Sequence, residues 1–207
     1  MSPEKETYTV LDSRELARGG FLTFVEERFT DPDGEVFTRW VVRHPGAVVA
    51  VALVDGVRGP EAVCVRQFRA AVRRNMLELP AGKLDVEGEN PDAAMARELA
   101  EEIGRRPGRL VKLASFWNSP GFCTELTHVY LALDLEECEA PEPAKAEERH
   151  MTIEAVPLAD IDRLIAATEI ADAKTIIGLC LADRYLRSGG TPSPGRSGGT
   201  PSPGDRR

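Results

Sequence analysis

Residues 47–54 read AVVAVALV, a run of apolar side chains without a polar interruption. A strand with one face toward water alternates apolar and polar residues, whereas a continuous apolar run is typical of a strand buried on both faces. A second run, EAVCVRQF over 61–68, follows closely after the turn residues Asp55 and Gly56. We therefore expect two buried strands at the centre of the fold.

The rest of the sequence predicts further strands and three helices around this centre. Two segments rich in aromatic residues flank the turn residues DPDG and predict a hairpin over about 21–43. Asn90 and Pro91 are a good N-cap and first helical residue, and Gly104 is a good stop, so a helix is expected over 91–103. The remaining expected elements are strands at 76–80, 109–117, 126–135 and 151–156, and helices at about 158–167 and 173–186. Mixed strands with helices near the middle and the end indicate an α/β sandwich.

The C-terminal stretch 187–207 has a different composition from the rest. The segment RSGGTPSPG occurs twice in succession, at 187–195 and 196–204, and is followed by DRR. Without large apolar residues it cannot bury enough surface to offset its ordering entropy. We therefore expect one folded domain over 1–186, with N-terminal strands at about 7–43 and a main part at about 44–186, and a disordered tail over 187–207.

Charge and apolar pattern exclude several classes of protein. The net charge of −8 argues against a nucleic-acid partner, which would call for a basic face. No apolar run approaches the length of about 18 residues that spans a membrane. The start MSPEKETYTVLDSREL lacks the apolar stretch of a signal peptide, so a cytoplasmic location is expected. The four cysteines are scattered without a CxxC pair, which favours reduced thiols over a zinc site or disulfides.

The predicted helix over 91–103 carries a cluster of glutamates. Glu98 and Glu102 lie four residues apart and Glu101 three from Glu98, so the three crowd one side of the helix, while Arg97 can pair with Glu101. Like charges at this spacing repel unless a cation lies between them. Clustered carboxylate oxygens suit Mg²⁺, which can bridge phosphoryl oxygens and activate a water molecule. A solvated, charged helix face is the alternative reading of the same residues.

These residues fall into a longer pattern with fixed spacing. In order, its positions are Gly82, Glu89, Arg97, Glu98, Glu101, Glu102 and Gly104. They resemble the Nudix box, G-x5-E-x7-R-E-U-x-E-E-x-G-U, in which U is aliphatic. This sequence departs from it twice, with one extra residue between Gly82 and Glu89 and with Arg105 in place of the last aliphatic residue. The insertion lies in the loop before the helix and moves none of the helical glutamates relative to one another.

The resemblance covers about residues 20–186. The segment QFRAAVRRNMLELPAGKLD at 67–85 is similar to the region before the box in ADP-ribose pyrophosphatases, and Pro120 stands where that subfamily has a marker proline. The resemblance implies a Nudix-type α/β/α sandwich with a mixed sheet and N-terminal antiparallel strands. It also implies a homodimer in which the hairpin around Phe37 and Trp40 contributes to the interface, although a core role fits these aromatics equally well.

The resemblance further implies a role for each matching residue. The expected metal ligands are the carbonyl of Ala81 and the carboxylates of Glu98, Glu101 and Glu102, with Glu89 supporting the junction of loop and helix. Arg97 and Glu101 are counted with the catalytic residues. The expected substrate-binding residues are Arg39, Arg69, Ser119, Pro120, Gly121 and Glu125. Glu148 is the expected general base, with Glu147 as the alternative.

The implied reaction is Mg²⁺-dependent hydrolysis of ADP-ribose to AMP and ribose 5-phosphate, with Mn²⁺ as a possible substitute. The expected partner is therefore a small nucleoside diphosphate sugar, with neither nucleic acid nor membrane. Three alternatives stay open: another nucleoside diphosphate sugar as substrate, oxidised nucleotides as substrates, and a sensor that binds ADP-ribose without cleaving it. A sensor would be expected to have lost helical box glutamates, and Glu98, Glu101 and Glu102 are all present.

Overall fold

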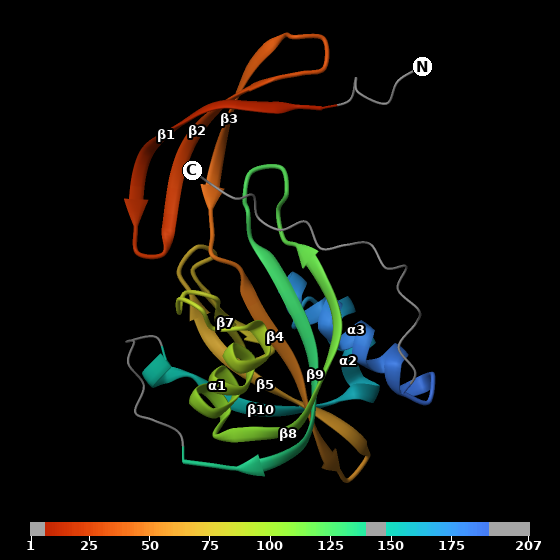
Figure 1. The fold of residues 1–207 in the computed structure, drawn as a ribbon. Helices are drawn as coiled ribbons and strands as arrows, with labels where there is room; N and C mark the ends of the chain where they lie inside the picture. Colours follow the sequence, from red (N-terminus) through yellow and green to blue (C-terminus); the bar gives the residue numbers. More distant parts are fainter. Residues whose placement is uncertain (1–6, 140–147, 191–207) are drawn as a thin grey trace.

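A computed structural model describes residues 7–139 and 148–190, and the side chain of Glu148 is not among the described parts. These residues form two β-sheets and three α-helices (Figure 1). The mixed sheet and the separate antiparallel N-terminal strands confirm the predicted fold class. None of the described helices is long and apolar enough to cross a membrane.

A seven-stranded sheet forms the body, with the strand order β10-β5-β4-β9-β8 and with β6 and β7 paired to β5 and β4. Its strands are β4 (Ala47–Gly56), β5 (Gly59–Arg69), β6 (Arg74–Glu78), β7 (Ala81–Lys83), β8 (Arg105–Trp117), β9 (Leu126–Glu137) and β10 (Thr152–Pro157). β4 and β9 run parallel, and the other pairs are antiparallel. The two apolar runs are thus β4 and β5, as predicted, and β4 lies between β5 and β9.

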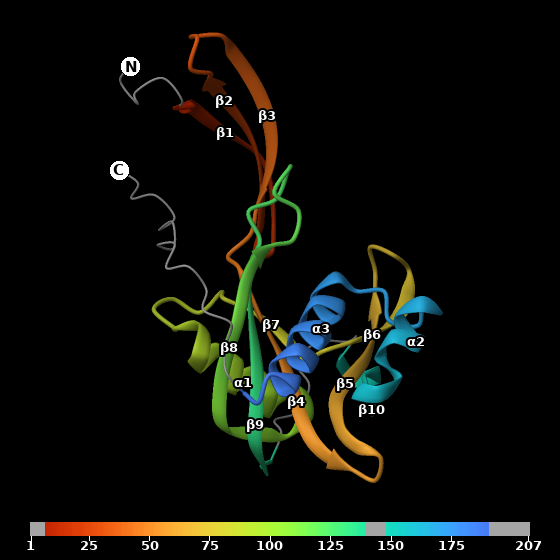
Figure 2. The same cartoon turned by 90° about the vertical axis from the view of Figure 1, so that its right-hand side faces the viewer.

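Helices cover both faces of this sheet (Figure 2). α1 (Pro91–Ile103) packs on one face through a cluster that includes Val48, Met95 and Leu99. α2 (Ile161–Ala166) and α3 (Ala173–Arg187) pack on the other face, in a cluster that includes Val49 and Leu179. Successive residues of a strand point to opposite faces, so an unbroken apolar run fills both clusters. This is why β4 needs no polar residue over its buried length.

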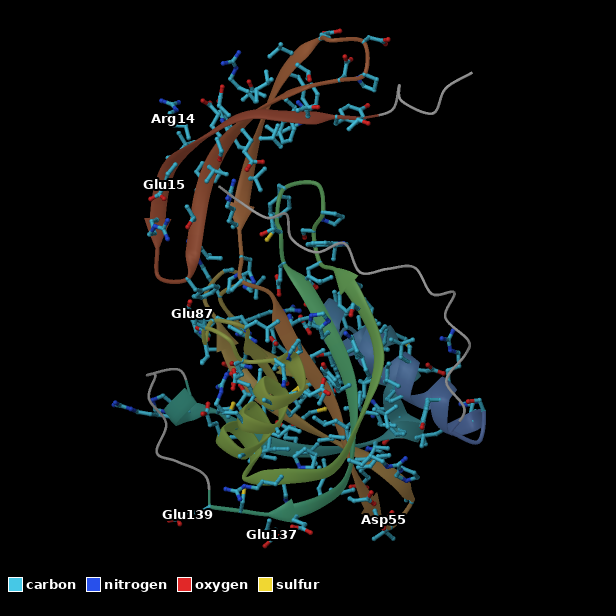
Figure 3. The ribbon with its side chains drawn as sticks, viewed as in Figure 1. Arg14, Glu15, Asp55, Glu87, Glu137 and Glu139 are labelled. Atoms are coloured by element: carbon cyan, nitrogen blue, oxygen red, sulfur yellow. The ribbon has the colours of Figure 1, made fainter. Side chains whose placement is uncertain are left out.

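The second sheet contains β1 (Thr9–Gly19), β2 (Leu22–Thr30) and β3 (Val36–Arg43) in that order. It projects away from the body and is joined to it through β3 (Figures 1 and 2). The predicted DPDG turn is present: Asp31 accepts backbone hydrogen bonds from Asp33 (2.9 Å) and Glu35 (2.8 Å). Arg14 and Glu15 project from its edge strand β1 (Figure 3).

Several predicted elements need correction at their ends. The strand expected at 76–80 is β6, which begins and ends two residues earlier, at Arg74 and Glu78. The helix expected over 158–167 is a 3₁₀ turn, Leu158–Asp160, followed by the short α2. The strand expected at 109–117 begins earlier, at Arg105, because β8 pairs with β9 along its whole length. α3 ends at Arg187, and residues 191–207 of the predicted tail lie outside the described residues.

Candidate active site

Local signals fix both ends of α1 where the sequence predicts them. The side chain of Asn90 accepts a hydrogen bond from the backbone N–H of Ala93 (2.8 Å), and Pro91 is the first helical residue. Gly104 adopts a left-handed conformation with φ of 62°, which glycine adopts without steric cost. The helix therefore presents Arg97 and the three glutamates at the expected spacing.

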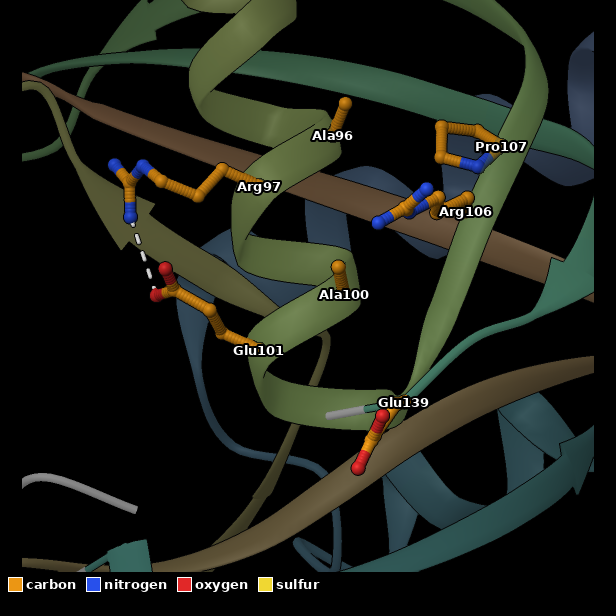
Figure 4. A pocket seen from close by; sticks show the side chains of 7 residues that line it. All are labelled: Ala96, Arg97, Ala100, Glu101, Arg106, Pro107 and Glu139. Atoms are coloured by element: carbon orange, nitrogen blue, oxygen red, sulfur yellow. Dashed lines mark hydrogen bonds and ion pairs between the residues drawn. The ribbon is translucent and has the colours of Figure 1, made fainter. Parts of the chain in front are cut away.

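Arg97 is the centre of an ion-pair network. Its guanidinium donates to both carboxylate oxygens of Glu89 (3.1 and 3.0 Å), and its Nη1 donates to Glu98 (2.7 Å) and Glu101 (3.2 Å). The pairing predicted between Arg97 and Glu101 is thus confirmed (Figure 4). The hydrogen bonds from Arg97 lower the pKa of Glu89, and those to Glu89 raise the pKa of Arg97. The loop before α1 is closed onto the helix by this pair.

β7 lies directly against the glutamates of α1. The backbone N–H of Ala81 donates to Glu102 Oε2 (3.0 Å). A Cβ atom on Gly82 would collide with the side chain of Glu98, so a residue other than glycine at position 82 would displace that glutamate. The structure thus brings Ala81, Gly82, Glu98 and Glu102 together. The group of Ala81 that contacts Glu102 is its N–H, whereas the group expected to bind metal is its carbonyl.

The carboxylates around Arg97 have the chemistry of a divalent-cation site, since Mg²⁺ and Mn²⁺ prefer oxygen ligands. Glu98 and Glu101 each present an oxygen to the same guanidinium nitrogen, so the position between them already accommodates a positive charge. Across residues 7–139 and 148–190, no group of three or more aspartate, glutamate, histidine or cysteine side chains is arranged so that it could hold a metal ion. An ion bound at Glu98 and Glu101 would therefore compete with Arg97 for their oxygens.

A pocket of about 490 Å³ lies between α1 and the start of β8 (Figure 4). Its lining residues are Ala96, Arg97, Ala100, Glu101, Arg106, Pro107 and Glu139. Arg97 and Glu101 line this pocket and also belong to the ion-pair network. Glu98 and Glu102 do not line the pocket. The pocket therefore adjoins the candidate metal site without containing all of its ligands.

Arg69 is held by an acidic residue that the sequence interpretation missed. Its guanidinium forms two hydrogen bonds with Glu78 (2.8 and 2.7 Å), whose side chain is 2% exposed. These bonds raise the pKa of Arg69, and the charge of Glu102 acts in the same direction. An acidic residue inside the apolar strand MLELP is the signal that could have revealed Glu78.

Arg39 lies elsewhere, on β3 in the projecting sheet. Its guanidinium carbon is 4.8 Å from the centre of the Phe37 ring, and its Nη1 donates to the carbonyl of Thr38 (2.8 Å). Arg39 is exposed, and the described contacts do not join it to the glutamates of α1 within one chain.

The loop between β8 and β9 holds the four residues expected to bind the terminal ribose: Ser119, Pro120, Gly121 and Glu125. The carbonyl of Ser119 accepts backbone hydrogen bonds from Phe122 (3.1 Å) and Cys123 (2.8 Å). The loop is also hydrogen-bonded to Val42 on β3, from the Val42 N–H to Phe122 (2.7 Å) and from Thr124 to the Val42 carbonyl (3.0 Å). The loop is therefore fixed between the body and the projecting sheet.

The expected general base is described in part. Glu148 begins a 3₁₀ turn, Glu148–His150, that leads into β10, and its side chain is outside the described parts. Glu147, the alternative base, lies outside the described residues. His150, at the end of this turn, is exposed.

Comparison with known proteins places this arrangement among related ones. Residues 43–177 match the family model of the NUDIX domain. The chain is 38% identical over 144 residues to an ADP-ribose pyrophosphatase of Bacillus subtilis, covering 70% of this chain and 75% of the relative. It is 35% identical over 187 residues to an ADP-ribose pyrophosphatase of Mycobacterium tuberculosis, covering 90% and 88%. A solved structure described as an ADP compounds hydrolase superposes with a TM-score of 0.78 at 23% identity, covering 91% of this chain and 99% of the other.

Proposed function

This chain belongs to the Nudix family of pyrophosphohydrolases, and on that basis we propose that it hydrolyses ADP-ribose to AMP and ribose 5-phosphate. The observation that carries the reaction type is the convergence of Glu98, Glu101 and Glu102 around Arg97 and the Ala81–Gly82 backbone. The choice of ADP-ribose is supported by two relatives of that activity that align with most of this chain.

A divalent cation is part of the proposal, with Mg²⁺ as the ion and Mn²⁺ as a substitute. Glu98, Glu101 and Glu102 would hold it, together with the Ala81 carbonyl. A bound ion would neutralise charge on the diphosphate and favour deprotonation of water. Glycine at position 82 leaves room for Glu98 beside β7, and the Glu89–Arg97 pair fixes the start of the helix relative to the loop.

The remaining roles concern orientation of the substrate and one proton transfer. The exposed part of the Arg69 guanidinium can donate to a phosphate while Glu78 fixes its plane. The loop 119–125 would hold the terminal ribose. Glu148 would take a proton from the attacking water. The water oxygen then bonds to one phosphorus, the bridging P–O bond breaks, and the two phosphates leave on separate products.

We further propose a cytoplasmic homodimer in which the projecting sheet of one copy reaches the site of the other. Large apolar side chains on that sheet are exposed, including Val10 (55%) and Trp40 (62%). Exposed apolar surface of this kind is typical of interfaces. A second copy would also give Arg39 a substrate to bind, since its own chain does not join it to α1.

The proposal is tested with a panel of substrates in Mg²⁺: ADP-ribose, other nucleoside diphosphate sugars, and oxidised nucleoside triphosphates. Phosphomonoester release is measured after coupling to a phosphatase. We expect the highest kcat/KM for ADP-ribose, and no turnover with EDTA. A clear preference for another nucleoside diphosphate sugar or for an oxidised nucleotide would identify that compound, and not ADP-ribose, as the substrate. Tight binding of ADP-ribose without turnover would favour the sensor.

The general base is tested in the same assay with Glu148→Gln and the adjacent Glu147→Gln. Loss of a base typically lowers the rate by roughly 10²–10⁴-fold. We expect this loss in kcat for Glu148→Gln, with partial recovery at high pH, and a nearly normal rate for Glu147→Gln. The reverse pattern would assign the base to Glu147.

A further inference from the structure

Tyr130 lies beneath α1 and forms a hydrogen bond with its first turn. The residue lies on β9, is 1% exposed, and packs in the apolar cluster on the α1 face of the sheet. Its hydroxyl donates to Asp92 Oδ1 at 2.7 Å. Burial raises the pKa of Tyr130, and the bond to Asp92 raises it further, so the phenol stays protonated as a donor. A buried side chain of the central sheet is thereby bonded to the second residue of α1.

The glutamates of α1 tolerate little displacement of the helix. Glu98 fits beside Gly82 without room for a Cβ atom, and Glu102 accepts from Ala81 at 3.0 Å. A displacement of about 1 Å at a catalytic centre can lower the rate by roughly 10²-fold. The depth of α1 against the sheet therefore bears directly on the candidate metal site.

Other polar contacts near the start of α1 do not join it to the sheet. The Asn90 cap is internal to the helix, and the Glu89–Arg97 pair joins the helix to the loop before it. Within residues 7–139 and 148–190, the side-chain hydrogen bond that joins the first turn of α1 to the central sheet is Tyr130–Asp92.

We propose that Tyr130 is a positioning residue, whose hydrogen bond to Asp92 sets the position at which Glu98 and Glu102 bind the divalent cation. This inference rests on the proposed function. Apolar packing holds α1 on the sheet, but it is not directional. The hydrogen bond is directional, so it can fix where the N-terminal end of α1 lies on the sheet. The Glu102–Ala81 contact lies near the other end of the helix.

The test removes the hydroxyl and measures metal binding without substrate. Tyr130→Phe keeps the ring in its apolar cluster, so the melting temperature should change little. We expect the dissociation constant for Mn²⁺, measured by calorimetry, to rise by about 10-fold, the scale for losing a group that orients metal ligands. We also expect a lower kcat for ADP-ribose with KM nearly unchanged.

Two variants of Asp92 separate the hydrogen bond from the charge. Asp92→Asn keeps an acceptor oxygen and should bind Mn²⁺ nearly as the wild type does. Asp92→Ala should reproduce Tyr130→Phe. Tyr185→Phe on α3 is the matched control for the loss of a tyrosine hydroxyl and should leave Mn²⁺ binding unchanged.

The outcomes distinguish this inference from the proposed function. Wild-type Mn²⁺ affinity in Tyr130→Phe, whatever its melting temperature, would show a purely structural contact and overturn the positioning role. The same holds if Asp92→Asn is as impaired as Asp92→Ala, because the charge would then be what matters. A wild-type chain that binds no Mn²⁺ would overturn the proposed function together with this inference.

Discussion

The two sheets of the molecule are built on opposite principles. The central sheet has helices on both faces, and strand residues such as Val51 and Leu131 are fully buried. In the projecting sheet every residue of β1 is exposed, and Val25 is the buried apolar residue among its described strands. Ion pairs such as Arg14–Glu26 and Arg28–Asp12 cross its surface, and exposed pairs of this kind contribute little to stability because water screens them.

This contrast indicates that the central sheet stabilises the fold and that the projecting sheet is available for recognition of a ligand or a partner. The central sheet buries enough apolar surface to hold the glutamates of α1 in place. The projecting sheet buries little within one chain, so it depends on its attachment to the body and, in our proposal, on a second copy. Its exposed side chains, Arg39 among them, are correspondingly available to a ligand or a partner.

The largest effect should separate chemistry in the body from recognition in the projecting sheet. Glu102→Gln should lower kcat by ~10²-fold or more with the fold intact, the scale for losing one strong electrostatic stabiliser. Arg39→Ala should instead raise KM by about 10-fold, as expected for a lost bond to a charged group. Steady-state kinetics with ADP-ribose at saturating Mg²⁺ measure both. Near-normal turnover in Glu102→Gln would contradict the assignment of the metal ligands.

The next prediction compares one substitution in both sheets. Val51→Ala in the central sheet should lower the free energy of unfolding by about 2 kcal/mol, because it removes fully buried methyl groups and leaves a cavity. Val25→Ala should cost less than about 1 kcal/mol, because the neighbouring surface is open and can relax. Chemical denaturation of the two variants at the same protein concentration measures the difference. Equal losses would mean that the projecting sheet is as tightly packed as the body.

A third substitution tests whether the exposed face is an interface. Trp40→Ser should raise the dissociation constant of the proposed dimer by roughly 10-fold or more, as for a buried aromatic anchor. Val57→Ser, at an exposed turn of the body, is the matched control and should leave it unchanged. Sedimentation velocity over a range of concentrations measures both. A wild type that stays monomeric would remove the dimer from the proposal.

A smaller effect is expected at the junction of the two regions, where His44 is half-buried and its backbone N–H donates to Thr124 (2.8 Å). Burial lowers the pKa of His44, and the charges of Lys83 and Lys174 lower it further while Glu125 and Asp85 oppose them. His44 then binds a proton more readily in the unfolded chain than in the folded one. Its contribution to the free energy of unfolding is therefore fully present above about pH 6.5 and is lost as pH falls toward the lowered pKa. The melting temperature of His44→Gln should therefore fall less between pH 7.5 and pH 5.5 than that of the wild type. Parallel curves would exclude His44 as a source of the pH dependence.

The smallest effect is expected at the C-terminus. The hydroxyl of Ser188 and the backbone N–H of Gly190 both donate to the carbonyl of Tyr185 and complete the end of α3. Truncation after Gly190 should therefore change neither melting temperature nor kcat/KM, since residues 191–207 contain no large apolar residue. A clear loss of either would extend the domain into residues 191–207.

Features that depend on residues close together in the sequence could be predicted, and features that depend on contacts between distant segments could not. The ends of α1 depend on Asn90, Pro91 and Gly104, which act within one helical turn, and they were predictable. The buried strands follow from apolar runs. The pairs Arg69–Glu78 and Tyr130–Asp92 depend on strand register and on helix packing across the sheet, which local patterns do not encode. β1 was not placed separately, because TVLDSRELARG, exposed throughout, lacks the alternation that marks a half-buried strand.

The tether between Glu89 and Arg97 has a consequence for how much the loop before α1 can vary. The loop carries one residue more than the family pattern, residues 85–88 are exposed, and Glu87 lies on its outside (Figure 3). Because Glu89 is bonded back onto the helix beyond the extra residue, chain added before it does not pull on the glutamates of α1. Pattern searches for relatives should therefore allow a variable gap at this point. Protein engineers could use the same gap to graft a short epitope or a fluorophore-binding peptide beside the catalytic centre.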